Sequence, residues 1–180
     1  MKVNLSQKWE SKGENARQIH DVERNIELKS RLTAHPFLTG MSPHHVEVLA
    51  TSAAIKQFQK DEVIFRAGQP ANGFYLIESG SVAIQGSVFE HSAISTDSVS
   101  AGEPLGWSWL FPPYLWHYDA RVIEPTTALF FDGTILHQAC KEDLTLGHEL
   151  FKRMSEVMVR RLQKSRRKII ELSRSLNVPN

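Results

Sequence analysis

The feature that most constrains the fold is a long central region, from Ala54 to Asp132, where short runs of β-forming residues alternate with Gly, Pro, Asn and Ser. Regular short runs separated by turn-forming residues are typical of a β-sandwich or a β-roll. We predict strands at Ile55–Gln59, Glu62–Arg66, Phe74–Ser79, Ser81–Ser87, Ala93–Ser98, Ala120–Glu124 and Ala128–Phe131. Turns are expected at Asn72-Gly73, Ser79-Gly80 and Ala101-Gly102.

Helices are predicted on both sides of this region. Ahead of it, Ser42 suits an N-cap and Pro43 suits the first helical position, with Phe37 and Leu38 placed to pack beneath that helix. After it, Thr134–Cys140 predicts a short helix, and apolar residues at steps of three and four predict one long helix from Leu144 to Leu172. The expected fold class is α+β, mainly β: a jelly roll (β-roll) flanked by helices, with a long C-terminal helix.

The chain is expected to have three parts. Residues 1–30 form a polar N-terminal arm or helix, whose thin apolar stripe is Ile19, Val22, Ile26 and Leu28. Residues 31–142 form the roll with its helical flanks, and residues 143–180 form the long C-terminal helix and a tail. Only Ser173–Asn180 follow Leu172, so we expect no helix-turn-helix module after the long helix.

Composition narrows the classes of function. The net charge is +1, which predicts no bulk attraction to nucleic acid. The single cysteine, Cys140, and the lack of a 20-residue apolar run predict a cytoplasmic protein without a membrane anchor. No nucleophile–base or phosphate-loop motif is present, so we expect a protein that is not an enzyme. The histidines and Cys140 lack metal-ligand spacing, and neither a metal nor another cofactor is expected.

Three short motifs carry a family resemblance. They are Val63-Ile64-Phe65-Arg66-Ala67-Gly68-Gln69-Pro70-Ala71, Phe74-Tyr75-Leu76-Ile77 and Gly80-Ser81-Val82. Gly68 and Gly80 stand between predicted strands, where a positive φ costs glycine little, and Gly80 is expected to close a hairpin. In this order the motifs resemble the cyclic nucleotide-binding domain family of the catabolite activator type, over roughly residues 30–172. The resemblance implies a regulatory ligand-binding domain in a stand-alone form.

The resemblance also implies where a ligand would bind. In the family, a Gly-Glu pair opens a short helix whose backbone N–H groups hold the cyclic phosphate, a later Arg pairs with that phosphate, and a Glu accepts from the ribose hydroxyl. The matching stretch here is Gly102-Glu103-Pro104-Leu105-Gly106-Trp107-Ser108-Trp109-Leu110-Phe111. Trp107 stands at the ribose-binding position, and His117 or Tyr118 stands at the position of the Arg.

These replacements shape the functional prediction. Losing one partner of a charge-assisted contact costs about 2–5 kcal/mol, so losing two would lower cAMP affinity by several decades. Three readings of the aromatic segment 107–118 follow: it fills the vacated pocket, it forms a pocket for another planar or anionic ligand, or it is a patch for a protein partner. The candidate ligand-binding residues are Gly106, Trp107, Ser108, Trp109, His117, Tyr118 and Arg121.

The long helix is the last candidate functional element. In the family this helix is a dimer seam, which implies a parallel homodimer here. The expected seam residues are Phe151, Met154, Met158, Leu162 and Ile169. The segment Arg160–Lys168 is basic and suits either a solvated helix face or a contact with phosphates or an acidic partner. The function is thus a regulatory sensor or, as the alternative, a non-binding roll that acts as a dimeric interaction module.

Overall fold

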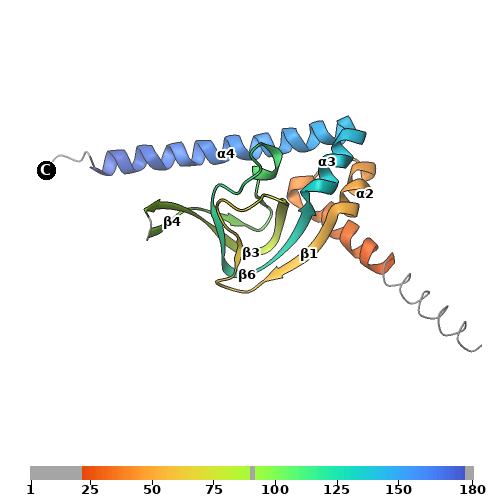
Figure 1. Ribbon diagram of the computed structural model, residues 1–180, viewed down its shortest axis with the longest axis horizontal. Helices are drawn as coiled ribbons and strands as arrows, with labels where there is room; N and C mark the ends of the chain where they lie inside the picture. Colours follow the sequence, from red (N-terminus) through yellow and green to blue (C-terminus); the bar gives the residue numbers. More distant parts are fainter. Residues whose placement is uncertain (1–21, 90–91, 177–180) are drawn as a thin grey trace, which may run out of the picture. The chain divides into compact units, whose positions relative to one another are not determined.

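The computed structural model describes residues 22–89 and 92–176 and divides into two compact units, one that ends at Gly133 and one that begins at Thr134. The first unit holds a helix over residues 22–34, a short 3-10 helix η1, the helix α2 and all the strands (Figure 1). The elements run η1 (Pro36–Leu38), α2 (Pro43–Ser52), β1 (Ala53–Phe58), β2 (Val63–Phe65), β3 (Gly73–Phe89), β4 (Ser92–Ser100), β5 (Pro104–Leu105), η2 (Ser108–Leu110) and β6 (Asp119–Asp132).

The strands form one antiparallel sheet in the order β1-β6-β3-β4, with β2 paired to β6 and β5 paired to β3. The two long strands β3 and β6 lie side by side along most of their length and bend together, as Figure 1 shows. An antiparallel sheet with flanking helices and a long C-terminal helix confirms the predicted α+β, mainly β fold class.

The predicted hairpin at Gly80 is wrong. Residues 73–89 form the single strand β3, and the two predicted strands after Ala120 are likewise the single strand β6. Gly80 has a φ of 87° and lies where the register of β3 against β6 shifts, so it makes a bulge inside a strand and not a turn between two strands. A Cβ on Gly80 would collide with the Pro125 carbonyl oxygen and with Thr126, so the bend depends on the missing side chain.

The core of the first unit lies against β3 and β6. Phe74 and Phe131 from these two strands stack with ring centroids 4.6 Å apart, and both are fully buried. Phe37 of η1 meets Phe74 edge-on at 6.2 Å. The prediction that Phe37 and Leu38 pack inward is confirmed, since their exposed fractions are 8% and 2%. Aromatic burial of this extent supplies much of the stability of a small domain.

The helical flank is partly as predicted. Pro43 begins α2, and the Ser42 hydroxyl accepts from the His45 backbone N–H at 3.1 Å, which confirms the predicted cap. In the helix over residues 22–34, however, the buried face is Leu28 and Leu32, while Val22 and Ile26 of the predicted stripe are exposed. Four-residue spacing from Leu28 to Leu32 keeps both side chains on one helix face. Ile19 lies outside the described residues.

The second unit is helical. It contains α3 (Gly133–Glu142) from its second residue onward, which confirms the predicted short helix, and α4 (Leu144–Leu176), which confirms and extends the predicted long one. Asp143 between them caps α4, because its carboxylate accepts from the backbone N–H groups of Thr145 and Leu146 at 2.9 and 3.1 Å. The absence of a side chain at Gly147 lets α4 approach Cys140 of α3 closely.

Candidate ligand site in the segment 102–121

The segment 102–121, which the resemblance matches to a nucleotide-binding site, begins at a tight turn that is hydrogen-bonded to β3. Gly102 has a φ of 86°, and its N–H donates to the Ile77 carbonyl oxygen at 2.7 Å. The Ile77 N–H in turn donates to the Glu103 carbonyl oxygen at 3.0 Å. The Glu103 carboxylate accepts from the Ser100 N–H at 2.8 Å, so Glu103 stabilises its own turn. The start of the segment is therefore held at one residue of a buried strand.

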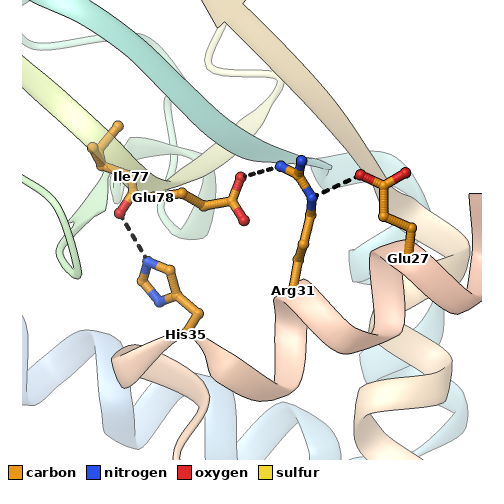
Figure 2. Close-up of polar contacts among 5 residues, drawn as sticks. All are labelled: Glu27, Arg31, His35, Ile77 and Glu78. Carbon is orange, nitrogen blue, oxygen red and sulfur yellow. Dashed lines mark hydrogen bonds and ion pairs between the residues drawn. The ribbon is translucent and has the colours of Figure 1, made fainter.

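Ile77 is also hydrogen-bonded to His35, at the end of the N-terminal helix (Figure 2). The sequence analysis did not single out this histidine. His35 is 4% exposed, its Nε2 lies 3.0 Å from the Ile77 carbonyl oxygen, and its Nδ1 accepts from the Phe37 N–H at 3.2 Å. These partners require a neutral ring that carries its proton on Nε2. Burial lowers the pKa of His35, although the bond to Ile77 and the nearby charge of Glu78 oppose that shift.

One helical turn before His35, Arg31 forms an ion pair between the helix over residues 22–34 and strand β3. Its guanidinium donates to Glu78 at 2.9 Å and to Glu27 at 3.0 Å, as Figure 2 shows. Glu78 follows Ile77 directly in β3, so two consecutive strand residues receive contacts from the helical flank. A lone histidine before a proline gave no signal in the sequence, because its role depends on a strand about 40 residues away.

The middle of the segment contains Trp116, which is buried against β2. Its indole stacks on Phe65 of β2 with ring centroids 3.8 Å apart and planes 11° apart, and it is 4% exposed. Gly106 has a φ of 87°, and a Cβ there would lie only 2.7–2.8 Å from the Trp116 ring. Gly106 therefore provides the space in which Trp116 lies. Trp116 belongs to the predicted aromatic segment but was absent from the candidate ligand residues.

Three of the candidate residues meet directly. The Trp107 indole stacks on the His117 ring with centroids 5.1 Å apart and planes 20° apart. The Ser108 hydroxyl lies 2.9 Å from His117 Nδ1, within hydrogen-bonding distance. Ser108 is buried, Trp107 is half-buried and His117 is exposed. We call Trp107, Ser108 and His117 the Trp–Ser–His cluster. It joins the residue that the resemblance matches to the ribose contact to one of the two residues that it matches to the phosphate contact.

The structure places Trp109, Tyr118 and Arg121 in different surroundings. Trp109 is 2% exposed and stacks on Phe74 of the core, with centroids 5.6 Å apart. Tyr118 is 43% exposed. Arg121 lies on β6 between the buried residues Ala120 and Val122, so its side chain leaves the opposite face of the strand. Its guanidinium donates to the Asp61 carbonyl oxygen at 2.8 Å, in the turn between β1 and β2.

The predicted seam residues of α4 differ in exposure. Met154 is 2% exposed and Met158 is half-buried, whereas Phe151, Leu162 and Ile169 are 50%, 59% and 65% exposed. From Leu162 to Ser175 every residue of α4 is exposed. Val159, Ile170 and Leu172 add further apolar surface in this stretch. The distal part of the helix thus keeps an apolar face accessible.

Two absences concern only the part of the chain that the structure describes. Within residues 22–89 and 92–176, no group of three or more His, Cys, Asp or Glu side chains is arranged to hold a metal ion. In the same ranges, none of the helices combines the length and apolar character that crossing a membrane requires.

Comparison with known proteins places this geometry in a family. Residues 55–143 match the family model of the cyclic nucleotide-binding domain. These residues therefore belong to the cyclic nucleotide-binding domain family, as the resemblance implied. No curated protein matches the chain.

Solved structures agree with this placement. A protein of Geobacter metallireducens GS-15 that is named for cyclic nucleotide binding is 25% identical, with a TM-score of 0.66 over 74% of this chain and 96% of its own. A cyclic nucleotide-binding domain of Methylobacillus flagellatus is 17% identical, with a TM-score of 0.69 over 83% of this chain and 84% of its own. The regulatory subunit of a cAMP-independent protein kinase A of Trypanosoma brucei is 20% identical, with a TM-score of 0.62 over 75% of this chain and 48% of its own. The likeness confirms the predicted β-roll, and for the latter two it concerns the fold alone.

Proposed function

We propose that this chain is a cytoplasmic regulatory domain of the cyclic nucleotide-binding family that does not grip cAMP through the family's ribose and phosphate contacts. The Trp–Ser–His cluster carries this proposal. The family resemblance matches Trp107 to the ribose contact and either His117 or Tyr118 to the phosphate contact. Trp107 and His117 stack on each other at 5.1 Å. Neither side chain supplies the carboxylate or the guanidinium that charge-assisted binding of a cyclic nucleotide uses.

The cluster suits a different kind of ligand. The indole and the imidazole offer π-faces and ring nitrogens, and both side chains keep accessible surface. Small-molecule sites in proteins combine apolar walls with a few polar anchors, which is the composition of this segment. We therefore propose a planar ligand with a hydrogen-bond acceptor or an anionic group, bound by contacts and not chemically transformed.

The relatives are consistent with a regulatory role without cAMP. The trypanosome regulatory subunit has the same fold, and its name states that the kinase is cAMP-independent. The fold therefore exists in a protein whose regulation does not use that nucleotide.

Titration calorimetry with cAMP and cGMP tests the proposal. The wild-type chain should give no binding heat at ligand concentrations up to about 1 mM, because two contacts of about 2–5 kcal/mol each are missing. The double variant Trp107→Glu, His117→Arg restores both contact types and should gain affinity for cAMP. A second double variant, Trp107→Glu with Tyr118→Arg, places the arginine at the other residue that the resemblance matches to the phosphate contact. Micromolar cAMP binding by the wild-type chain would overturn the proposal.

A second candidate function is a protein-interaction module that assembles through α4. It is favoured by the exposed apolar residues of the distal helix, of which Leu162 and Ile169 are more than half exposed. A homodimer along this helix is the form that the family resemblance implies. In this case the buried stack of Trp116 on Phe65 would fill the roll and no ligand would be needed. Sedimentation of the full chain at several concentrations tests assembly directly.

A further inference from the structure

The distal part of α4 combines an apolar stripe with a strong positive charge. Residues 159–175 contain seven basic side chains and one acidic side chain, Glu171, whereas the whole chain has a net charge of only +1. The basic residues are Arg160, Arg161, Lys164, Arg166, Arg167, Lys168 and Arg174. Charge is therefore concentrated on the same stretch whose apolar residues are exposed.

The apolar residues of this stretch repeat as in a coiled coil. Leu162 and Ile169 are seven residues apart and take position a of a heptad, and Leu172 takes position d. Their side chains are 59%, 65% and 56% exposed. Positions d also include Phe151, Met158 and Ser165. Exposed apolar residues at a and d form a face that a second helix can cover.

The residues that flank this face decide which helix fits. With Leu162 at position a, Arg161 and Lys168 take position g, and Arg166 takes position e. In a parallel pair of identical helices, position g of one faces the next position e of the other, so Arg161 would lie against Arg166 of the second copy on both sides of the seam. In an antiparallel pair, positions g face each other, which would bring Arg161 and Lys168 together. Like charges across a seam act against pairing.

An acidic helix removes this conflict. Glutamates at its e and g positions would pair with Arg161, Arg166 and Lys168 while its own apolar a and d residues cover Leu162 and Ile169. We propose that residues 159–175 of α4 bind an acidic amphipathic helix of another protein in preference to a second copy of this chain. The proposal rests on the second candidate function and names its partner.

Two other anionic surfaces fit less well. A nucleic acid would satisfy the basic side chains but would leave the apolar stripe uncovered. A lipid surface would cover apolar residues, but Arg166 lies between the directions of Leu162 and Ile170 on the helix, inside the apolar arc that would enter the lipid. A partner helix accommodates Arg166 at the edge of its seam.

The test uses the full chain and two synthetic coiled-coil peptides that share Ile at a and Leu at d. One peptide carries Glu at every e and g position, and the other carries Lys there. Fluorescence anisotropy should show the acidic peptide binding at least about tenfold more tightly than the basic one, with affinity falling as salt screens the pairs. Leu162→Ser with Ile169→Ser should abolish binding, while helical circular dichroism shows that the variant is folded.

A pair of charge reversals sharpens the test. Arg161→Glu places an acid at position g, opposite Arg166 of a second copy, so it should weaken binding of the acidic peptide and promote homodimers in sedimentation. Arg160→Glu makes the same change of charge on the outer face, at position f, and should do neither.

The outcomes separate the two proposals. A wild-type chain that forms homodimers through Leu162 and Ile169 and does not prefer the acidic peptide would overturn the partner proposal and leave the interaction module standing. Binding of duplex DNA or anionic vesicles without binding of the acidic peptide would also overturn it. If the serine variant changes neither peptide binding nor assembly, the interaction module itself fails.

Discussion

The buried imidazole of His35 donates from Nε2 to the carbonyl oxygen of Ile77 across 3.0 Å. The same carbonyl accepts the N–H of Gly102, the first residue of the candidate segment 102–121. One strand residue therefore connects the N-terminal flank to the candidate site. Because burial lowers the pKa of His35, this connection depends on pH.

Acidification should destabilise the domain through His35. In the unfolded chain His35 binds a proton near pH 6.5, whereas in the folded chain it does so only at lower pH. The contribution of His35 to the free energy of unfolding is therefore fully present above pH 6.5 and declines as the pH falls below that value. The slope from this residue is at most about 1.4 kcal/mol per pH unit. Urea unfolding at pH 7.5, 6.5 and 5.5 measures it. His35→Gln should flatten the slope, whereas His148→Gln, at an exposed position, should leave it unchanged; equal slopes in all three proteins would contradict the prediction.

The ion pair between Arg31 and Glu78 should contribute measurably to stability. The two side chains are 34% and 19% exposed, so water screens the pair only partly. Glu78→Gln should lower the free energy of unfolding by about 1 kcal/mol, and a double-mutant cycle with Arg31→Met should show coupling between the two residues. The exposed pair of Lys29 with Glu47 is the control, and Glu47→Gln should cause no measurable change. Equal effects at the two pairs would show that burial is not the cause.

Gly106→Ala should disturb the candidate site more than a positive φ alone explains. Alanine at a φ near 87° costs about 1–2 kcal/mol, and its Cβ would also collide with Trp116. Gly68→Ala is the matched control, because Gly68 has a φ of 80° and no atom within 4 Å of an added Cβ. We expect thermal melts to show a larger loss for Gly106→Ala, together with a changed tryptophan emission spectrum. Identical losses would argue against close packing at Trp116.

Gly80→Ala should strongly destabilise the roll. An added Cβ would lie 2.7 Å from the Thr126 Cα and in contact with the Pro125 carbonyl oxygen, and both are backbone atoms that cannot rotate away. We expect a loss of more than about 3 kcal/mol, which exceeds typical overpacking because strain and collision combine. Gly40→Ala has a similar φ of 77° with open space around it and should lose much less stability. Urea unfolding followed by circular dichroism measures both losses, and equal losses would argue against a collision at Gly80.

Much of the fold could be predicted from the sequence, because caps and periodicity are local signals. Ser42 and Pro43 marked the start of α2, and the three- and four-residue steps marked α4. The interpretation of Gly80 failed because a glycine between two β-forming runs looks the same whether it makes a turn or a bulge. Gly80 forms a bulge because it packs against Pro125 and Thr126, which lie about 45 residues away in the chain.

The candidate site was less accessible to sequence reasoning. The replacements at Trp107 and His117 were visible, but the sequence does not show which of three neighbouring tryptophans is buried. Trp109 and Trp116 are buried by Phe74 and Phe65, residues of distant strands. Arg121 was a candidate because of its position after the segment, yet the alternation of side chains along β6 directs it to Asp61. The ligand roles of these residues remain predictions.

The stack of Trp116 on Phe65 has a consequence for any ligand that needs its space. Such a ligand can bind only to molecules in which the stack is open, so its observed affinity equals the intrinsic affinity multiplied by the open fraction. A weak ligand in solution could therefore be a strong ligand of the open form. Anything that opens the stack, whether a substitution or a partner, would then switch on recognition without touching the ligand itself.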